Sequence, residues 1–146
     1  MPEKNTDELE HELQTADNLN TFDEENAEFF RQYTLAEYLQ KLLEDKQLVK
    51  AQVIRDSHLD EIYAYRIFSG DRKNTSRKNI LSLAIAMKLS PKETDYLLYY
   101  AGHKKLYVKD PWDHIIWYAL SKGKNILETN ELLEAGKHST LLGKMD

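Results

Sequence analysis

Four basic residues lie close together in the chain: Arg72, Lys73, Arg77 and Lys78. Guanidinium and ammonium groups neutralise phosphate, and such contacts supply most of the affinity of a protein for a nucleic-acid backbone. A run of charges is more commonly a solvated surface, so the cluster indicates phosphate binding only if the fold places it beside a surface that contacts bases.

The residues before the cluster predict such a surface. Segment 50–72, KAQVIRDSHLDEIYAYRIFSGDR, contains two short helical patterns with a break at Ser57-His58-Leu59 and a stop at Ser69-Gly70. Two short helices joined in this way form a helix-turn-helix, whose second helix can enter the major groove of DNA. Lys50 then lies at the amino end of the first helix, where its ammonium and the free N–H groups can hold phosphate. With Arg55 and Arg66, seven bases fall near one surface.

The second helix carries groups that can contact bases. The predicted contact residues are Glu61, Ile62, Tyr63, Tyr65 and Arg66. Arg66 can pair with guanine and Glu61 can accept from cytosine N4, while Ile62 and Tyr63 can touch thymine methyl groups. Other interpretations stay open. Asp60 suits a helix N-cap, Glu61 complements the helix dipole, and Tyr63 or Tyr65 packs in the core. An exposed Ile-Tyr-Tyr surface also suits a protein partner.

The net charge of −5 is distributed unevenly. Residues 1–33 carry ten acids and two bases, whereas residues 34–90 carry ten bases and seven acids. Salt screens electrostatic interactions beyond a Debye length of ~8 Å. The net negative charge of the whole chain therefore does not argue against nucleic-acid binding at a locally basic surface. One hypothesis is that the acidic segment covers the basic surface and competes with DNA; a solubilising segment is the simpler alternative.

The composition narrows the class of protein. A length of 146 residues with 41% apolar content is enough for a globular core. With no cysteine, disulfides and thiolate metal sites are excluded. We expect no membrane segment, no secretory signal and a cytoplasmic location. Neither metal-ligand spacing, a phosphate-binding glycine loop nor a nucleophile motif is evident, so we expect no catalytic residue and no cofactor.

Helix-start signals recur along the chain and strand patterns do not. Capping-box patterns occur at Thr21–Glu24, Thr34–Glu37, Ser90–Glu93 and Asn125–Glu128, and Asp110-Pro111 is a further start. They predict an all-α protein with a polar segment 1–20, holding at most a weak turn around Leu9 and Leu13. The predicted helices span 22–32, 35–45, 50–57, 60–68, 76–88, 91–101, 111–121 and 126–135.

Residues 34–90 resemble the XRE-type, lambda-repressor-like helix-turn-helix family. The resemblance rests on Val53, the break at 57–59, Leu59, Ile67, Gly70, Arg72, Leu81, Leu83-Ala84 and Leu89. Residues 91–146 look like the C-terminal helical extension of firmicute members, through Glu93, Leu97-Leu98, Ala101-Gly102 and Leu106-Tyr107. The resemblance implies a five-helix bundle whose third helix contacts double-stranded DNA, with extra helices after it (91–146). It does not cover the acidic N-terminal segment 1–33, where the capping pattern predicts an extra helix near 22–32. The resemblance also implies transcription regulation and a homodimer.

Three departures from the family pattern are tolerable. Ile54 stands where the family has a small residue and Ala64 where it has a large one, so the total volume is roughly conserved. His58 stands at a turn position that favours glycine, because its φ is expected to be positive, and histidine is among the better-tolerated substitutes. We therefore expect the fold to survive.

The predicted helix 111–121 is apolar almost all round, which is typical of a helix that is buried or half covered by a partner. Ile116 and Leu120 suit the core, whereas Trp112 and Tyr118 are candidate interface anchors. The favoured interpretation is a DNA-binding regulator. The alternative is an adaptor that binds a protein and not DNA.

Overall fold

The computed structural model describes residues 6–19 and 32–141. The chain divides into two compact units, Met1–Gln32 and Tyr33–Asp146. In the first unit, α1 spans Thr6–Thr15, where the sequence predicted no more than a weak turn. Asp7 and Glu8 lie in its first turn, where carboxylates complement the helix dipole. The helix predicted near 22–32 and its capping pattern fall, except for residue 32, outside the described residues.

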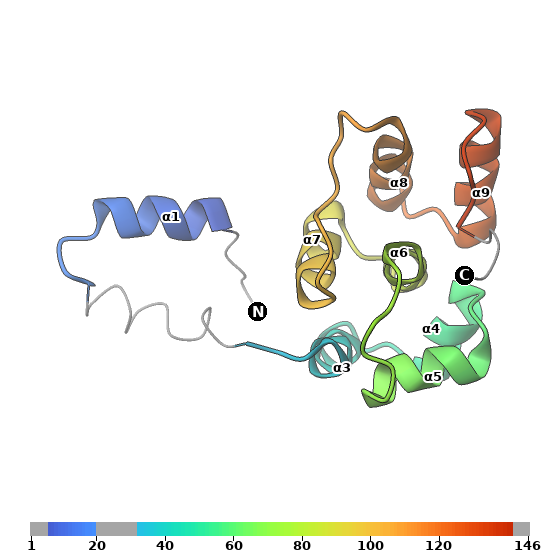
Figure 1. Ribbon diagram of the computed structural model, residues 1–146, viewed down its shortest axis with the longest axis horizontal. Coiled ribbons are helices and arrows are strands. Elements are labelled where there is room, and N and C mark those ends of the chain that lie inside the picture. Colours follow the sequence, from blue (N-terminus) through green and yellow to red (C-terminus); the bar gives the residue numbers. More distant parts are fainter. Residues whose placement is uncertain (1–5, 20–31, 142–146) are drawn as a thin grey trace. The chain divides into compact units, whose positions relative to one another are not determined.

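The second unit, called here the helical unit, contains seven helices among its described residues 33–141. They are α3 (Leu35–Asp45), α4 (Lys50–Ser57), α5 (Glu61–Ser69), α6 (Arg77–Ala86), α7 (Pro91–Tyr100), α8 (Pro111–Ser121) and α9 (Ile126–Ala135). No strand occurs in the part of the chain that the structure describes. The all-α prediction is confirmed, and the helix bounds differ from the predicted ones by at most two residues (Figure 1).

The helix starts follow the predicted caps. Thr34, Ser90 and Asn125 each form a capping box with the glutamate three residues later. Asp110 accepts hydrogen bonds from the N–H groups of Trp112 and Asp113, and Pro111 is the first residue of α8. Each cap satisfies N–H groups that have no partner inside the helix.

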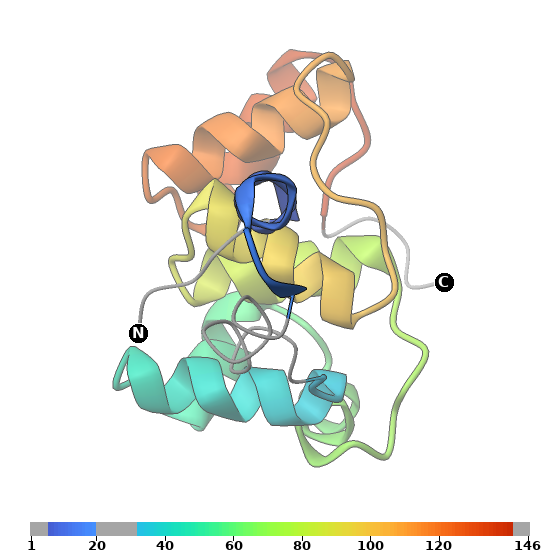
Figure 2. The ribbon, with the colours of Figure 1, turned by 90° about the vertical axis from the view of Figure 1, so that its left-hand side faces the viewer.

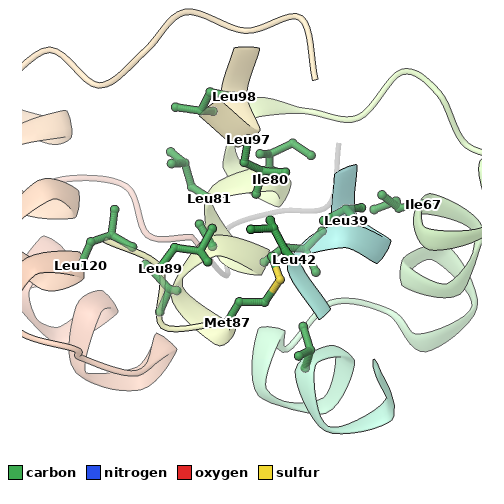
Figure 3. Close-up of a cluster of buried hydrophobic side chains, with 14 of the residues drawn as sticks. Leu39, Leu42, Ile67, Ile80, Leu81, Met87, Leu89, Leu97, Leu98 and Leu120 are labelled. Atoms are coloured by element: carbon green, nitrogen blue, oxygen red, sulfur yellow. The ribbon is translucent and has the colours of Figure 1, made fainter. Parts of the chain in front are cut away.

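Helix α6 is the centre of the helical unit. It packs against α4 below it, α7 to its left, and α8 and α9 above it in the view of Figure 1. The helical spacing of Ile80, Leu83, Ala84 and Met87 predicts one apolar stripe on this helix. In the structure all residues from Ile80 to Ile85 are buried, so the helix is covered all round. Figure 3 shows Ile80 and Leu81 between Leu39 and Leu42 of α3 and Leu97 and Leu98 of α7.

Helices α4 and α5 form a pair joined by the three residues 58–60. Helix α3 packs on α5, and α4 packs on α6. Ile54 and Ala64 are both buried, 3% and 0% exposed, as the volume exchange between these positions requires. The pair is therefore held against the core from both sides, and its outer surface is left to solvent.

Candidate nucleic-acid interface

The turn before α5 is fixed by local bonds. His58 has φ 60°, the left-handed conformation that the sequence predicted for this position. The hydroxyl of the buried Ser57 donates to the carbonyl of Ile54 and accepts from the N–H of Leu59. Asp60 then caps α5 by accepting from the N–H of Tyr63 at 2.9 Å. These bonds between near neighbours in the chain hold the turn.

The end of α5 is equally defined. Gly70 ends the helix with φ 91°, and a side-chain carbon there would lie 3.5 Å from Cβ of Ala36. The left-handed backbone, more than the space, makes glycine the suitable residue.

The exposed face of α5 carries most of the predicted base-contacting residues. Ala64, Ile67 and Phe68 are buried and orient the helix. The opposite face presents Glu61, Ile62, Tyr65 and Arg66 to solvent, with Ile62 68% and Tyr65 39% exposed. An isoleucine so exposed beside an arginine and a glutamate leaves a mixed surface that could contact the edges of base pairs.

Tyr63 is half-buried and packs against the core. Its hydroxyl accepts a hydrogen bond from Nδ2 of Asn79 at 3.0 Å, which joins α5 to the first turn of α6. The guanidinium of Arg72 lies 5.2 Å from the centre of its ring. Tyr63 is therefore a support for Arg72 and for the junction of α5 and α6, with less surface available than its neighbours Ile62 and Tyr65.

The remaining predicted cations flank α5. Lys50 begins α4 and is half-buried, with Nζ 5.8 Å from the centre of the Phe68 ring. Arg72 and Lys73 are exposed in the loop between α5 and α6. None of Lys50, Arg66, Arg72 and Lys73 forms an ion pair with a described residue, so no carboxylate of that part of the chain pairs with these charges.

Arg77 lies apart from this group because its guanidinium is bonded inside the protein. Two of its nitrogens donate to the two carboxylate oxygens of Asp113 on α8, both at 2.8 Å. Nε and Nη2 also donate to the carbonyls of Lys104 and Lys105, each at 3.1 Å. Four hydrogen bonds use most of the five N–H donors of an arginine. Arg77 therefore fastens α6 to α8 and to the loop before it.

Asp113 is the acid of this arrangement, and its side chain is 3% exposed. Burial raises its pKa, but the hydrogen bonds from Arg77 and from the N–H of Tyr107, with the charges of Arg77 and Lys104, lower the pKa below the usual range. The carboxylate therefore stays ionised at neutral pH and holds the arginine in place.

Lys78 is also engaged within the protein. Its Nζ donates to the hydroxyl of Ser139 at 3.0 Å and to the carbonyl of Thr140 at 3.2 Å, and lies 5.7 Å from the centre of the Trp112 ring. Trp112 in turn donates from Nε1 to the carbonyl of Ser139 at 2.8 Å. Lys78 and Trp112 thus hold the segment after α9 against α6 and α8.

Tyr118, the second candidate interface anchor, lies in different surroundings from Trp112. Tyr118 on α8 is 45% exposed, and its neighbour Trp117, which the sequence analysis did not single out, is 42% exposed. Ile116 and Leu120 are buried, as predicted. The exposed aromatic surface of α8 is therefore formed by Trp117 and Tyr118, while Trp112 is partly buried against the core.

Two lysines that sequence reasoning missed lie next to the α5–α6 loop. Lys104 and Lys105 are exposed in the connection from α7 to α8, and their carbonyls accept the bonds from Arg77. The sequence shows a local group of lysines there, but the bonds that bring it to residue 77 span 27 and 28 positions.

With Arg77 and Lys78 bonded internally, segment 50–76 has five bases and four acids. Asp60 is used as a cap, and Asp56 accepts from Nε2 of Gln52. The surface of α4, α5 and their following loop is therefore only weakly basic.

Among the described residues, no helix is long and apolar enough to cross a membrane, and no three His, Asp or Glu side chains are grouped as metal ligands. Neither a family model, a curated protein nor a solved structure matches the chain.

Proposed function

We propose that this chain is a sequence-specific DNA-binding transcriptional regulator of the XRE, lambda-repressor-like type. The observation that carries the proposal is the outward face of α5, where Glu61, Ile62, Tyr65 and Arg66 stand clear of a helix anchored by its buried side. Helices α3 to α7 occur in the order that the resemblance implies for a five-helix bundle, and α5 is the third of them.

In the proposed complex, α5 enters the major groove. Arg66 pairs with guanine, and Glu61 accepts from the amino group of cytosine. Ile62 and Tyr65 contact thymine methyl groups. Lys50, Arg72 and Lys73 hold the phosphates on either side, which sets the position of the helix but not its base preference. Arg77 and Lys78 take no part in this contact and act as structural residues of the unit.

A selection from random duplexes at low salt tests the proposal, followed by salt titration of the selected duplex. We expect Arg66→Ala to cost ~1–3 kcal/mol and to relax the preference at one base pair. Arg72→Gln with Lys73→Gln should weaken binding to all DNA sequences alike. It should also reduce the slope of log affinity against log salt concentration by about 1.8, or ~0.9 for each lost phosphate contact. Sedimentation of the same complex measures the homodimer that the resemblance implies.

The matched control is Lys122→Gln with Lys124→Gln, which removes the same charge from the turn between α8 and α9. It should leave the slope unchanged. If neither the full chain nor the chain without residues 1–20 binds any duplex at low salt, the proposal is refuted. Binding only after removal of residues 1–20 would instead support competition by the acidic segment.

The second candidate function is that of an adaptor which binds a protein. It is favoured by the 68% exposure of Ile62 beside Tyr65, and by the near balance of charges on segment 50–76. Binding through apolar side chains depends weakly on salt, whereas phosphate contacts depend on it steeply. Ile62→Ala would then abolish capture of the partner while no duplex binds.

A further inference from the structure

The loop between α7 and α8 carries a second group of exposed cations. Lys104, Lys105 and Lys109 are exposed, while Leu106 between them is buried and anchors the loop to the core. The acid that follows, Asp110, is used as the cap of α8. The positive charges of this loop therefore face solvent from a fixed backbone.

Five hydrogen bonds fix that backbone. The ring of His103 donates from Nε2 to the carbonyl of Thr75, and Arg77 donates to the carbonyls of Lys104 and Lys105. The N–H of Leu106 donates to Asp95 at 2.8 Å, and the N–H of Tyr107 donates to Asp113 at 3.0 Å. The bonds use backbone atoms of residues 104 and 105, so their side chains are not needed to hold the loop.

The same bonds place this loop against the loop from α5 to α6. Thr75 belongs to the latter, and Figure 2 shows both loops on the same side of the helical unit. Arg72 rests on Tyr63 of α5, and Tyr63 is bonded to Asn79 in the first turn of α6, where Arg77 also lies. The surface of α5 therefore continues through Arg72 and the start of α6 to Lys104 and Lys105.

The two acids near these lysines, Asp95 and Asp113, accept hydrogen bonds from other groups. Asp113 is buried and neutralised by Arg77. Asp95 is half-buried and accepts from Leu106, and burial raises its pKa although the charges of Lys105 and Arg77 act against the rise. Neither Lys104 nor Lys105 forms an ion pair with a described residue. Both ammonium groups can therefore reach an external anion.

We infer that Lys104 and Lys105 bind the phosphate backbone of the same DNA duplex whose bases α5 contacts. This inference rests on the proposed function and extends the phosphate-binding surface to a loop outside segment 50–78. The partner is a duplex because its phosphates continue along the groove edge from Arg72, whereas a single small anion would occupy only one site. The lysines take the place of Arg77, whose charge is paired with Asp113, and of Lys78, whose ammonium is hydrogen-bonded to Ser139 and Thr140.

The test is the variant Lys104→Gln with Lys105→Gln, compared with Lys122→Gln and Lys124→Gln at the other end of α8. Fluorescence anisotropy follows binding of the full chain to the selected duplex. Two lost phosphate contacts should reduce the slope of log affinity against log salt concentration by about 1.8. The ratio of wild-type to variant affinity should therefore fall roughly tenfold as the salt concentration rises from about 50 to about 200 mM. Base preference should be unchanged. Far-UV circular dichroism and the melting temperature check that both variants fold.

Two results would overturn the inference while the proposed function stands. One is that the wild type binds DNA and replacing Arg72 and Lys73 lowers the salt slope of binding, whereas the loop variant has the same slope as its control. The other is a loop variant that changes preference at one base pair without a change of slope. If neither the full chain nor the chain without residues 1–20 binds any duplex, both proposals fail together.

Discussion

Replacing Asp113 by asparagine should destabilise the helical unit by about 3 kcal/mol. The substitution keeps the shape of the side chain and one acceptor oxygen but removes the charge. Arg77, whose side chain is 19% exposed, then keeps its charge in a place where water replaces the carboxylate poorly. The N–H of Tyr107 also depends on the carboxylate, because it donates to the same oxygen that Nη2 of Arg77 contacts.

The magnitude follows from the geometry of the pair. Removing one partner of a buried ion pair typically costs ~3–5 kcal/mol, and the lower end applies because Arg77 is partly exposed. For a unit of this size, each kcal/mol lowers the melting temperature by about 4 °C, so a decrease of about 12 °C is expected. The pair Lys41–Asp45 on α3, at 2.7 Å, is the matched control, because its aspartate is 46% exposed where Asp113 is 3% exposed. Asp45→Asn should cost at most ~0.5 kcal/mol.

Urea and thermal unfolding of Asp113→Asn, Arg77→Gln and the double variant measure the coupling. The two single changes should each cost about 3 kcal/mol, and the double variant should cost less than their sum by at least ~1.5 kcal/mol. The structural role assigned to Arg77 would be refuted by a coupling below ~0.5 kcal/mol, or by an Arg77→Gln variant as stable as Asp45→Asn.

Two further predictions concern pH and the turn. The pKa of Asp113 is lowered from its ordinary value of 3.8, so its ionised form stabilises the fold above that pH, and the contribution is lost as the pH falls through the lower folded pKa. Urea unfolding at a series of pH values measures the difference in unfolding free energy between the wild type and Asp113→Asn. This difference should be constant near neutral pH and should shrink below pH 3.8. A difference that is constant at every pH would contradict the assignment. His58→Gly should raise the melting temperature by stabilising the folded state ~0.5–1 kcal/mol, because His58 has φ 60°. Ala51→Gly in α4 is its control and should be destabilising by a similar amount.

Helix positions in this protein could be predicted because their signals are local. A capping box joins residues three positions apart, so Ser90 and Glu93 reveal the start of α7 without any knowledge of the rest of the chain. The positive φ of His58 was instead expected from the family resemblance, which places this residue at a turn position that favours glycine, and the structure has φ 60° there. The helix at Thr6–Thr15 was missed because the segment is polar and its apolar pattern is short.

The burial of α6 on all sides was not predictable from its own residues. Its apolar stripe indicated one covered face, but α7, α8 and α9 cover the other faces as well. For a similar reason, the sequence did not determine which side chains of α8 stay exposed. Trp112 and Trp117 are alike in the sequence, yet only Trp112 meets the carbonyl of Ser139.

By itself, the sequence determined the helical class, the bounds of helices α3 to α9 to within two residues and the break between α4 and α5, because short-range bonds and periodicity specify each of them. Only the tertiary structure decided which cations remain available. Arg77 meets Asp113 across 36 positions and Lys78 meets Ser139 across 61. The charge of Arg77 is thereby paired, and the ammonium of Lys78 is hydrogen-bonded within the protein. The same packing brings Lys104 and Lys105 beside the loop after α5. The physical reason is that a charge contributes to a surface according to its neighbours in space and not according to its place in the chain.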